Sequence, residues 1–218
     1  MFNDKFGLTK AVLEGRKTQT RRIALLPQKE VQNLEDYLEV THEDKSILRY
    51  IIDRYCHLKV GETLAVAQDY ETVNREYIDK VFRCHGKTGR DILDNGMEAC
   101  KTCKNPDYCL DKYASVCTSP GWQNKMFVKA DLMIHQIRIT DIRLERLQDI
   151  SDEDCLKEGI IEDSPGVQYS FPTEIGYCSQ YPFDTPKAAY AALIDKISGK
   201  GTWGKNPWVF VYNFEFVK

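Results

Sequence analysis

The chain has 218 residues, a formal net charge of −3, 42% hydrophobic residues and 29% charged residues, which fits one globular domain that carries insertions. The mild acidity argues against binding polyanions over the whole surface, so any nucleic-acid contact needs a local basic cluster. No apolar run approaches the ~20 residues of a membrane span, and the N-terminus lacks a secretory signal, so we expect a cytoplasmic protein with no membrane partner.

The first predicted element is a short helix. Leu8, Ala11 and Val12 have helical spacing, and Gly15 suits the position after a helix end. The octet GRKTQTRR, residues 15–22, follows and leads into a predicted extended segment. A solvated basic turn, a phosphate-binding strip and part of an active site are all open interpretations of this octet.

Two helices are predicted within residues 29–58, separated near Thr41. GETLAVAQDY, residues 61–70, predicts a turn followed by a strand. Residues 84–121 have little periodicity and most of the cysteines, which indicates an irregular insertion.

The next segment predicts a strand that changes phase. Ile137 and Ile139 alternate with polar residues, and the apolar phase then moves to Ile142. Because side chains alternate strictly along a strand, we expect a bulge near Asp141. Ser151 then begins a capped helix, with Asp154 as its capping-box partner and Gly159 after its end.

The remaining elements are a Pro- and Tyr-rich loop at 164–185, a helix at 187–197 and a last strand, WVFVYNFEFV, with aromatic residues on one face. Short strands with helical excursions predict an α+β fold built on a small closed or half-closed β-barrel.

Four of the eight cysteines are crowded into residues 100–117 of the insertion: Cys100, Cys103, Cys109 and Cys117. A CxxC pair with two further thiols nearby fits a tetrahedral site, so structural zinc is the leading interpretation. An iron–sulfur cluster and free or oxidised thiols are the alternatives.

Four blocks resemble the ASCH domain family, whose PUA-like β-barrels are common in phage and bacterial genomes: GRKTQTRR, GETLAVAQDY, ITDIRLERLQDISDEDCLKEGI and GKGTWGKNPWVFVYNFEF. The resemblance implies a single PUA-like domain over residues 1–218, with a helical insertion at 29–58 and a Cys-rich one at 84–121. It also implies a cleft that binds RNA or a modified nucleoside. A small bacterial member is an amidohydrolase that acts on N4-acetylcytidine with lysine, threonine and glutamate.

Those family residues fall on Lys17, Thr20 and Glu158 of this chain. The Ser-Arg pair that usually precedes the ITDIR strand is replaced by Asp131 and Leu132. In the implied reaction Lys17 removes the proton of Thr20, whose oxygen attacks the acyl carbon.

The residues themselves add two conditions to this reaction. A lysine acts as a base only when its pKa is lowered, which burial and the arginines Arg16, Arg21 and Arg22 would favour. Lys17 and Thr20 can act together only if residues 16–19 form a turn, because residues three apart face opposite sides of a strand. The three arginines are predicted to hold phosphate. Binding of RNA or a nucleoside is the leading prediction, and the amidohydrolase is the alternative.

Overall fold

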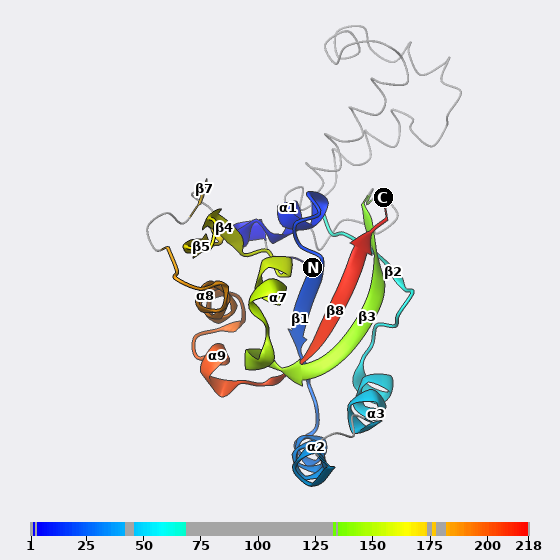
Figure 1. Ribbon diagram of the computed structural model, residues 1–218. Helices are drawn as coiled ribbons and strands as arrows, with labels where there is room; N and C mark the ends of the chain where they lie inside the picture. The colour runs from blue at the N-terminus through cyan, green and yellow to red at the C-terminus, as the bar shows by residue number, and fades with distance from the viewer. Residues whose placement is uncertain are drawn as a thin grey trace, which may run out of the picture. The chain divides into compact units, whose positions relative to one another are not determined.

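The computed structural model describes residues 2, 4–41, 46–68, 133, 135–173, 176–177 and 182–217, which are coloured in Figure 1. Most of them belong to one compact unit, Phe2–Leu64 and His135–Lys218, and the fold below is that of this unit. The second unit, Ala65–Ile134, contains few described residues.

The described part of the chain contains both helices and strands. Its first part holds η1 (Asp4–Phe6), α1 (Leu8–Leu13), β1 (Gln19–Ile23), α2 (Gln28–Thr41), α3 (Ser46–Tyr55) and β2 (Thr63–Ala65). Its later part holds β3 (Gln136–Arg146), η6 (Leu147–Asp149), α7 (Asp152–Lys157), β4 (Ile161–Ser164), β5 (Gln168–Ser170), β6 (Pro172–Thr173), β7 (Gly176–Tyr177), α8 (Pro186–Ser198), α9 (Thr202–Lys205) and β8 (Trp208–Phe216). This mixture confirms the predicted α+β class.

A curled four-stranded sheet in the order β1-β8-β3-β2 forms the centre of the unit (Figure 1). The strand β8 pairs antiparallel with both β1 and β3. Its aromatic residues lie opposite apolar residues of β3, with Phe214 opposite Ile139 and Phe210 opposite Leu144. Paired residues share one face of a sheet, so these side chains form one apolar face, hereafter the aromatic face.

The change of phase in β3 is a bulge, as predicted. The register between β3 and β8 shifts between Ile139 and Asp141, so Thr140 is the extra residue. The bulge allows Ile139 and Ile142 to share the aromatic face. It also turns Asp141 and Arg143 together to the opposite face.

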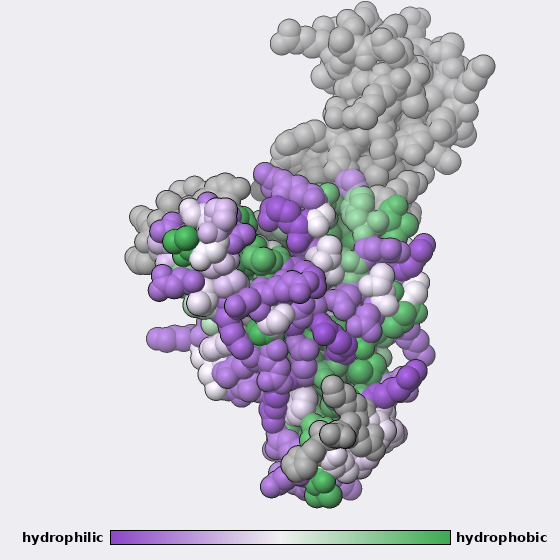
Figure 2. Space-filling model, in the orientation of Figure 1, coloured by the Kyte–Doolittle hydropathy of each residue, from purple (hydrophilic) through white to green (hydrophobic). Residues whose placement is uncertain are grey.

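That opposite face packs against α7 and α8. Val209 and Val211 of β8 share a buried cluster with Cys155 of α7 and with Tyr190 and Leu193 of α8. Hydrophilic side chains dominate the visible surface around α7 (Figure 2). The packing therefore holds α7 against β1, with polar groups at its outer edge.

The predicted helix ends are confirmed. The hydroxyl of Ser151 accepts a hydrogen bond from the backbone N–H of Asp154 at 3.1 Å. Gly15 and Gly159 follow α1 and α7 with φ of +73° and +105°, which glycine adopts without steric cost. The helices predicted within 29–58 are α2 and α3, and α2 ends at Thr41.

Other predictions are corrected or lie outside the described residues. Residues 164–185, expected to be a loop, contain parts of the hairpins β4–β5 and β6–β7. The Cys-rich insertion at 84–121 lies outside the described residues. No helix in the described ranges is long and apolar enough to cross a membrane.

Candidate functional site

Lys17 and Glu158 form a buried ion pair beside the sheet. The Lys17 ammonium lies 2.6 Å from Glu158 Oε2 and also donates to the Glu158 backbone carbonyl at 2.7 Å. Lys17 is only 2% exposed. Because Glu158 ends α7, the ammonium also occupies the favourable position for a cation at a helix C-terminus. The structure thus brings together two of the three residues that the resemblance implied.

Burial sets the protonation chemistry of Lys17. It lowers the pKa of Lys17 below the ordinary lysine value, and the attraction of Glu158 offsets only part of that shift. Lys17 therefore releases its proton more readily than an exposed lysine. By contrast, burial raises the pKa of the Cys155 thiol to about 12, so this described cysteine is a poor nucleophile.

Thr20 does not join the Lys17–Glu158 pair. It lies in the regular strand β1, opposite Tyr212 of the aromatic face. Arg21 is the next residue along β1, and its side chain points to the other face, where it contacts Glu158. Residues 16–19 do not form the turn that would direct the Thr20 side chain toward Lys17, because β1 already begins at Gln19. The alternation of the strand separates the predicted nucleophile from its predicted base.

Arg21 is an interior residue, which corrects the prediction that it binds phosphate. Its side chain is 1% exposed. The guanidinium contacts the carboxylates of Glu145 at 2.7 Å, Asp154 at 3.1 Å and Glu158 at 3.1 Å. Each of its terminal nitrogens is used in this network, so Arg21 stabilises the fold and is closed to a ligand's phosphate.

The other two arginines have different surroundings. Arg16 is exposed, and its guanidinium binds the carboxylate of Glu14 at 2.7 Å. Arg22 is exposed and lies opposite Phe210, on the side of β1 away from Arg21. The basic octet therefore does not present its arginines as one phosphate-binding strip.

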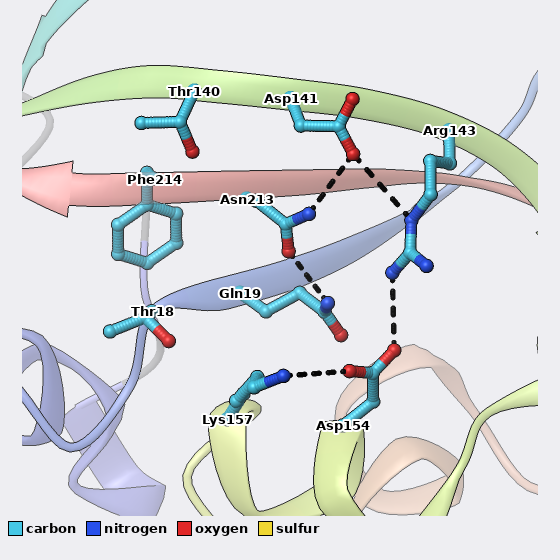
Figure 3. Close-up of a pocket in the computed structure, with 9 residues that line it drawn as sticks. All are labelled: Thr18, Gln19, Thr140, Asp141, Arg143, Asp154, Lys157, Asn213 and Phe214. Carbon is cyan, nitrogen blue, oxygen red and sulfur yellow. Dashed lines mark hydrogen bonds and ion pairs between the residues drawn. The ribbon is translucent and has the colours of Figure 1, made fainter.

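A polar pocket of about 350 Å³ opens next to this network (Figure 3). Strands β1, β3 and β8 and helix α7 supply its walls. The lining residues are Thr18, Gln19, Thr140, Asp141, Arg143, Asp154, Lys157, Asn213 and Phe214. Ligand pockets in proteins commonly have volumes of about 300–1,000 Å³, so this pocket is large enough for one small molecule.

One side of the pocket is formed by a closed ring of hydrogen-bonded and ion-paired side chains, hereafter the ring, all of which line the pocket except the buried Arg21. Its members are Arg21, Gln19, Asn213, Asp141, Arg143 and Asp154. Figure 3 shows all of them except Arg21. Gln19 donates to Asn213 at 2.6 Å, and Asn213 donates to Asp141 at 3.1 Å. Such a connected network holds its side chains in one geometry.

The carboxylate of Asp154 closes the ring. Both Arg21 and Arg143 donate to its Oδ2 at 3.1 Å. Burial alone would raise the pKa of Asp154, but the bonds from these two guanidinium groups lower it below the ordinary aspartate value. Asp154 is therefore held as an anion between two cations.

Most of the pocket residues were not singled out from the sequence. Asn213 carried a usable signal, because its amide interrupts the apolar run of the last strand. Alternation along β1 also places Gln19 on the same side as Arg21. The sequence patterns point to Asp141 only as the site of the bulge and to Asp154 only as part of the helix cap. Their convergence depends on strand pairing between residues as far apart as Gln19 and Asn213, which local patterns do not reveal.

The cysteine quartet Cys100, Cys103, Cys109 and Cys117 lies outside the described residues, and zinc binding there stays a prediction. Within the described ranges, no group of three or more His, Cys, Asp or Glu side chains is arranged to hold a metal ion.

No protein-family model, curated protein or solved structure gives a significant match to this chain.

Proposed function

We propose that the pocket binds a nucleobase, presented either by a free nucleoside or by one nucleotide of RNA. The observation that carries this proposal is the order of hydrogen-bonding groups along the ring. Asp141, Asn213 and Gln19 follow one another and all line the pocket. A planar base edge is a row of donors and acceptors, and it is read by such a row of side chains.

The Asp141 carboxylate and the second hydrogens of the Asn213 and Gln19 amides can offer a base an acceptor followed by two donors. The ring uses one oxygen of Asp141, while its carboxylate is half-exposed. Gln19 and Asn213 each spend one amide hydrogen and one oxygen lone pair on the ring among the described residues, which leaves one hydrogen and one lone pair on each amide. Gln19 is only 1% exposed, so a base would reach it from the pocket side alone. Cytosine has the complementary Watson–Crick edge, namely the N4 amino donor followed by the N3 and O2 acceptors. Uracil and guanine have different orders.

The charge of the pocket favours the base over the phosphate. The lining carboxylates of Asp141 and Asp154 balance the cations Arg143 and Lys157. A phosphate dianion gains little net attraction from such a site. We therefore expect cytidine and cytidine monophosphate to bind with similar affinity and with little dependence on salt, unlike ligands held through phosphate contacts.

The fold supports the same class of ligand. The curled antiparallel sheet with α7 against its edge is compatible with the PUA-like barrel that the resemblance implied. In that reading the pocket is the cleft of the barrel, and the ASCH-type blocks GRKTQTRR and ITDIRLERLQDISDEDCLKEGI supply most of its wall.

Isothermal titration of the purified protein with cytidine, uridine and guanosine tests this proposal. Cytidine should bind at least about tenfold more tightly than the other two, because each matched pair of hydrogen bonds is worth about 1–3 kcal/mol of discrimination. Asn213→Leu should remove the preference. Thr20→Val, on the opposite face of β1, is the matched control and should bind like the wild type. Equal affinity for all three nucleosides, or no binding of any, would refute the proposal.

The Lys17–Glu158 pair favours a second candidate, the amidohydrolase. Burial lowers the pKa of its lysine, which is the direction that a general base requires, and an N4-acyl cytidine keeps one N4 hydrogen for Asp141. Thr18, which follows Lys17 in the chain, lines the pocket and carries a hydroxyl, whereas Lys17 itself is not a lining residue. Chromatography of N4-acetylcytidine incubated with the wild type, Lys17→Met, Thr18→Ala and Thr20→Ala would test it. Turnover that is lost in Lys17→Met and kept in Thr20→Ala would support hydrolysis, and no wild-type turnover would reject it.

A further inference from the structure

The two amides in the pocket wall have a defined orientation. Arg21 has only donors, so the Gln19 oxygen must face it and the Gln19 nitrogen must face Asn213. Asp141 is a carboxylate and has only acceptors, so Asn213 must turn its nitrogen toward Asp141. The guanidinium at one end and the carboxylate at the other impose the same polarity on both amides.

We propose that Arg21 is a positioning residue that sets the base specificity of the pocket through Gln19 and Asn213. Arg21 itself is buried and does not line the pocket. Its contacts to Glu145 and Glu158 fix the guanidinium in place. Gln19 transmits that orientation to Asn213, which fixes where the free N–H and the free oxygen lone pair of each amide lie along the pocket wall. This inference rests on the proposal that the pocket binds a base.

The chain of hydrogen bonds from Arg21 through Gln19 and Asn213 to Asp141 is hereafter the relay. A single substitution should reverse its polarity. In Gln19→Glu the residue has only acceptors, so it still binds Arg21 but requires a donor from Asn213. The Asn213 amide must then turn over, which directs its oxygen toward Asp141 and breaks that hydrogen bond. The pocket loses the donors that match N3 and O2 of cytosine and gains acceptors in their place. Guanine presents donors at the corresponding N1 and N2 positions, although its O6 acceptor would still face the Asp141 carboxylate. The affinity for cytidine should therefore fall by more than the affinity for guanosine.

The first arm of the test needs no ligand. Asn213→Leu identifies the side-chain amide signals of Asn213 in the nitrogen–proton NMR spectrum of the unliganded protein. In the wild-type background, Asp141→Ala should move these signals because it removes the acceptor. In the Gln19→Glu background the same substitution should leave them in place. Equal shifts in both backgrounds would overturn the relay, whether or not any nucleoside binds.

The second arm measures specificity by calorimetry with cytidine and guanosine. Gln19→Glu should lower the ratio of cytidine affinity to guanosine affinity by at least about tenfold. Gln19→Leu removes the relay without reversing it, so it should weaken cytidine and give guanosine no gain. Thr20→Val should retain the wild-type ratio. An unchanged ratio in Gln19→Glu would overturn the specificity role. Absence of nucleoside binding in the wild type would refute the proposed function instead, and the NMR arm would still decide the orientation.

Discussion

Arg16 and Arg21 belong to one short basic stretch, yet they differ in burial and in contacts. Arg16 lies in solvent beside Glu14, while Arg21 lies inside, in contact with three carboxylates. Residue type alone predicted the same role for both. The difference arises because β1 starts at Gln19 and strand alternation turns Arg21 beneath α7.

Replacement of Arg21 should therefore destabilise the folded protein strongly. Arg21→Met should lower the free energy of unfolding by about 3–5 kcal/mol, because it leaves buried carboxylates without their cation. Arg16→Ala should change it by less than about 0.5 kcal/mol, as expected for an exposed pair. Urea denaturation followed by circular dichroism measures both. A loss below about 1 kcal/mol for Arg21→Met would contradict the buried network.

The pKa of Asp154 predicts how the free energy of unfolding depends on pH. Although burial opposes it, the bonds from Arg21 and Arg143 give Asp154 a lower pKa in the folded state than its ordinary value. The stabilisation that ionised Asp154 provides is therefore complete above its pKa in the unfolded state, about 3.9. This stabilisation is lost as the pH falls through the lower pKa of Asp154 in the folded state. Asp154→Asn should lose stability less steeply than the wild type below about pH 4. Urea midpoints between pH 5 and pH 2 measure this, and parallel curves for the two proteins would rule it out.

At the scale of elements, local signals sufficed for much of the fold. The capping box at Ser151, the glycines after α1 and α7, and the bulge at Thr140 all act within a few residues, so the sequence reveals them. The site was harder because it combines β1, β3, β8 and α7. Gln19 and Asn213 are 194 residues apart, and only the pairing of β1 with β8 makes them neighbours.

The contribution of the Ser151 cap of α7 to stability can be tested. Ser151→Ala should cost about 1 kcal/mol of unfolding free energy, since it leaves the backbone N–H of Asp154 without its acceptor. Ser198→Ala, at the exposed end of α8, is the control and should stay within about 0.5 kcal/mol. Because α7 carries Asp154 and Glu158, Ser151→Ala should also weaken cytidine binding. Equal stability of the two variants would show that the cap contributes nothing.

For the molecule as a whole, the sheet brings residues from both ends of the chain into one pocket, while the Cys-rich stretch lies between them in sequence. The spacing of the cysteines predicts a structural zinc ion in that stretch.

Elemental analysis of freshly purified protein should find about one zinc per chain. Substitution of Cys100 and Cys103 by serine should abolish it, and serine at Cys56, a described cysteine that lies outside the quartet, should not. Protein without metal, or with a brown chromophore from an iron–sulfur cluster, would exclude zinc.

The most direct test of the central proposal is an NMR titration of isotopically labelled protein with cytidine. Ligand in the pocket should shift the side-chain amide signals of Gln19 and Asn213 together, in a saturable way, because both amides donate to the base. The backbone signal of Arg16, in the exposed turn before Lys17, should not move. Saturable shifts of both amides would support the account. Binding that leaves both amide signals unchanged, or no binding at all, would contradict it.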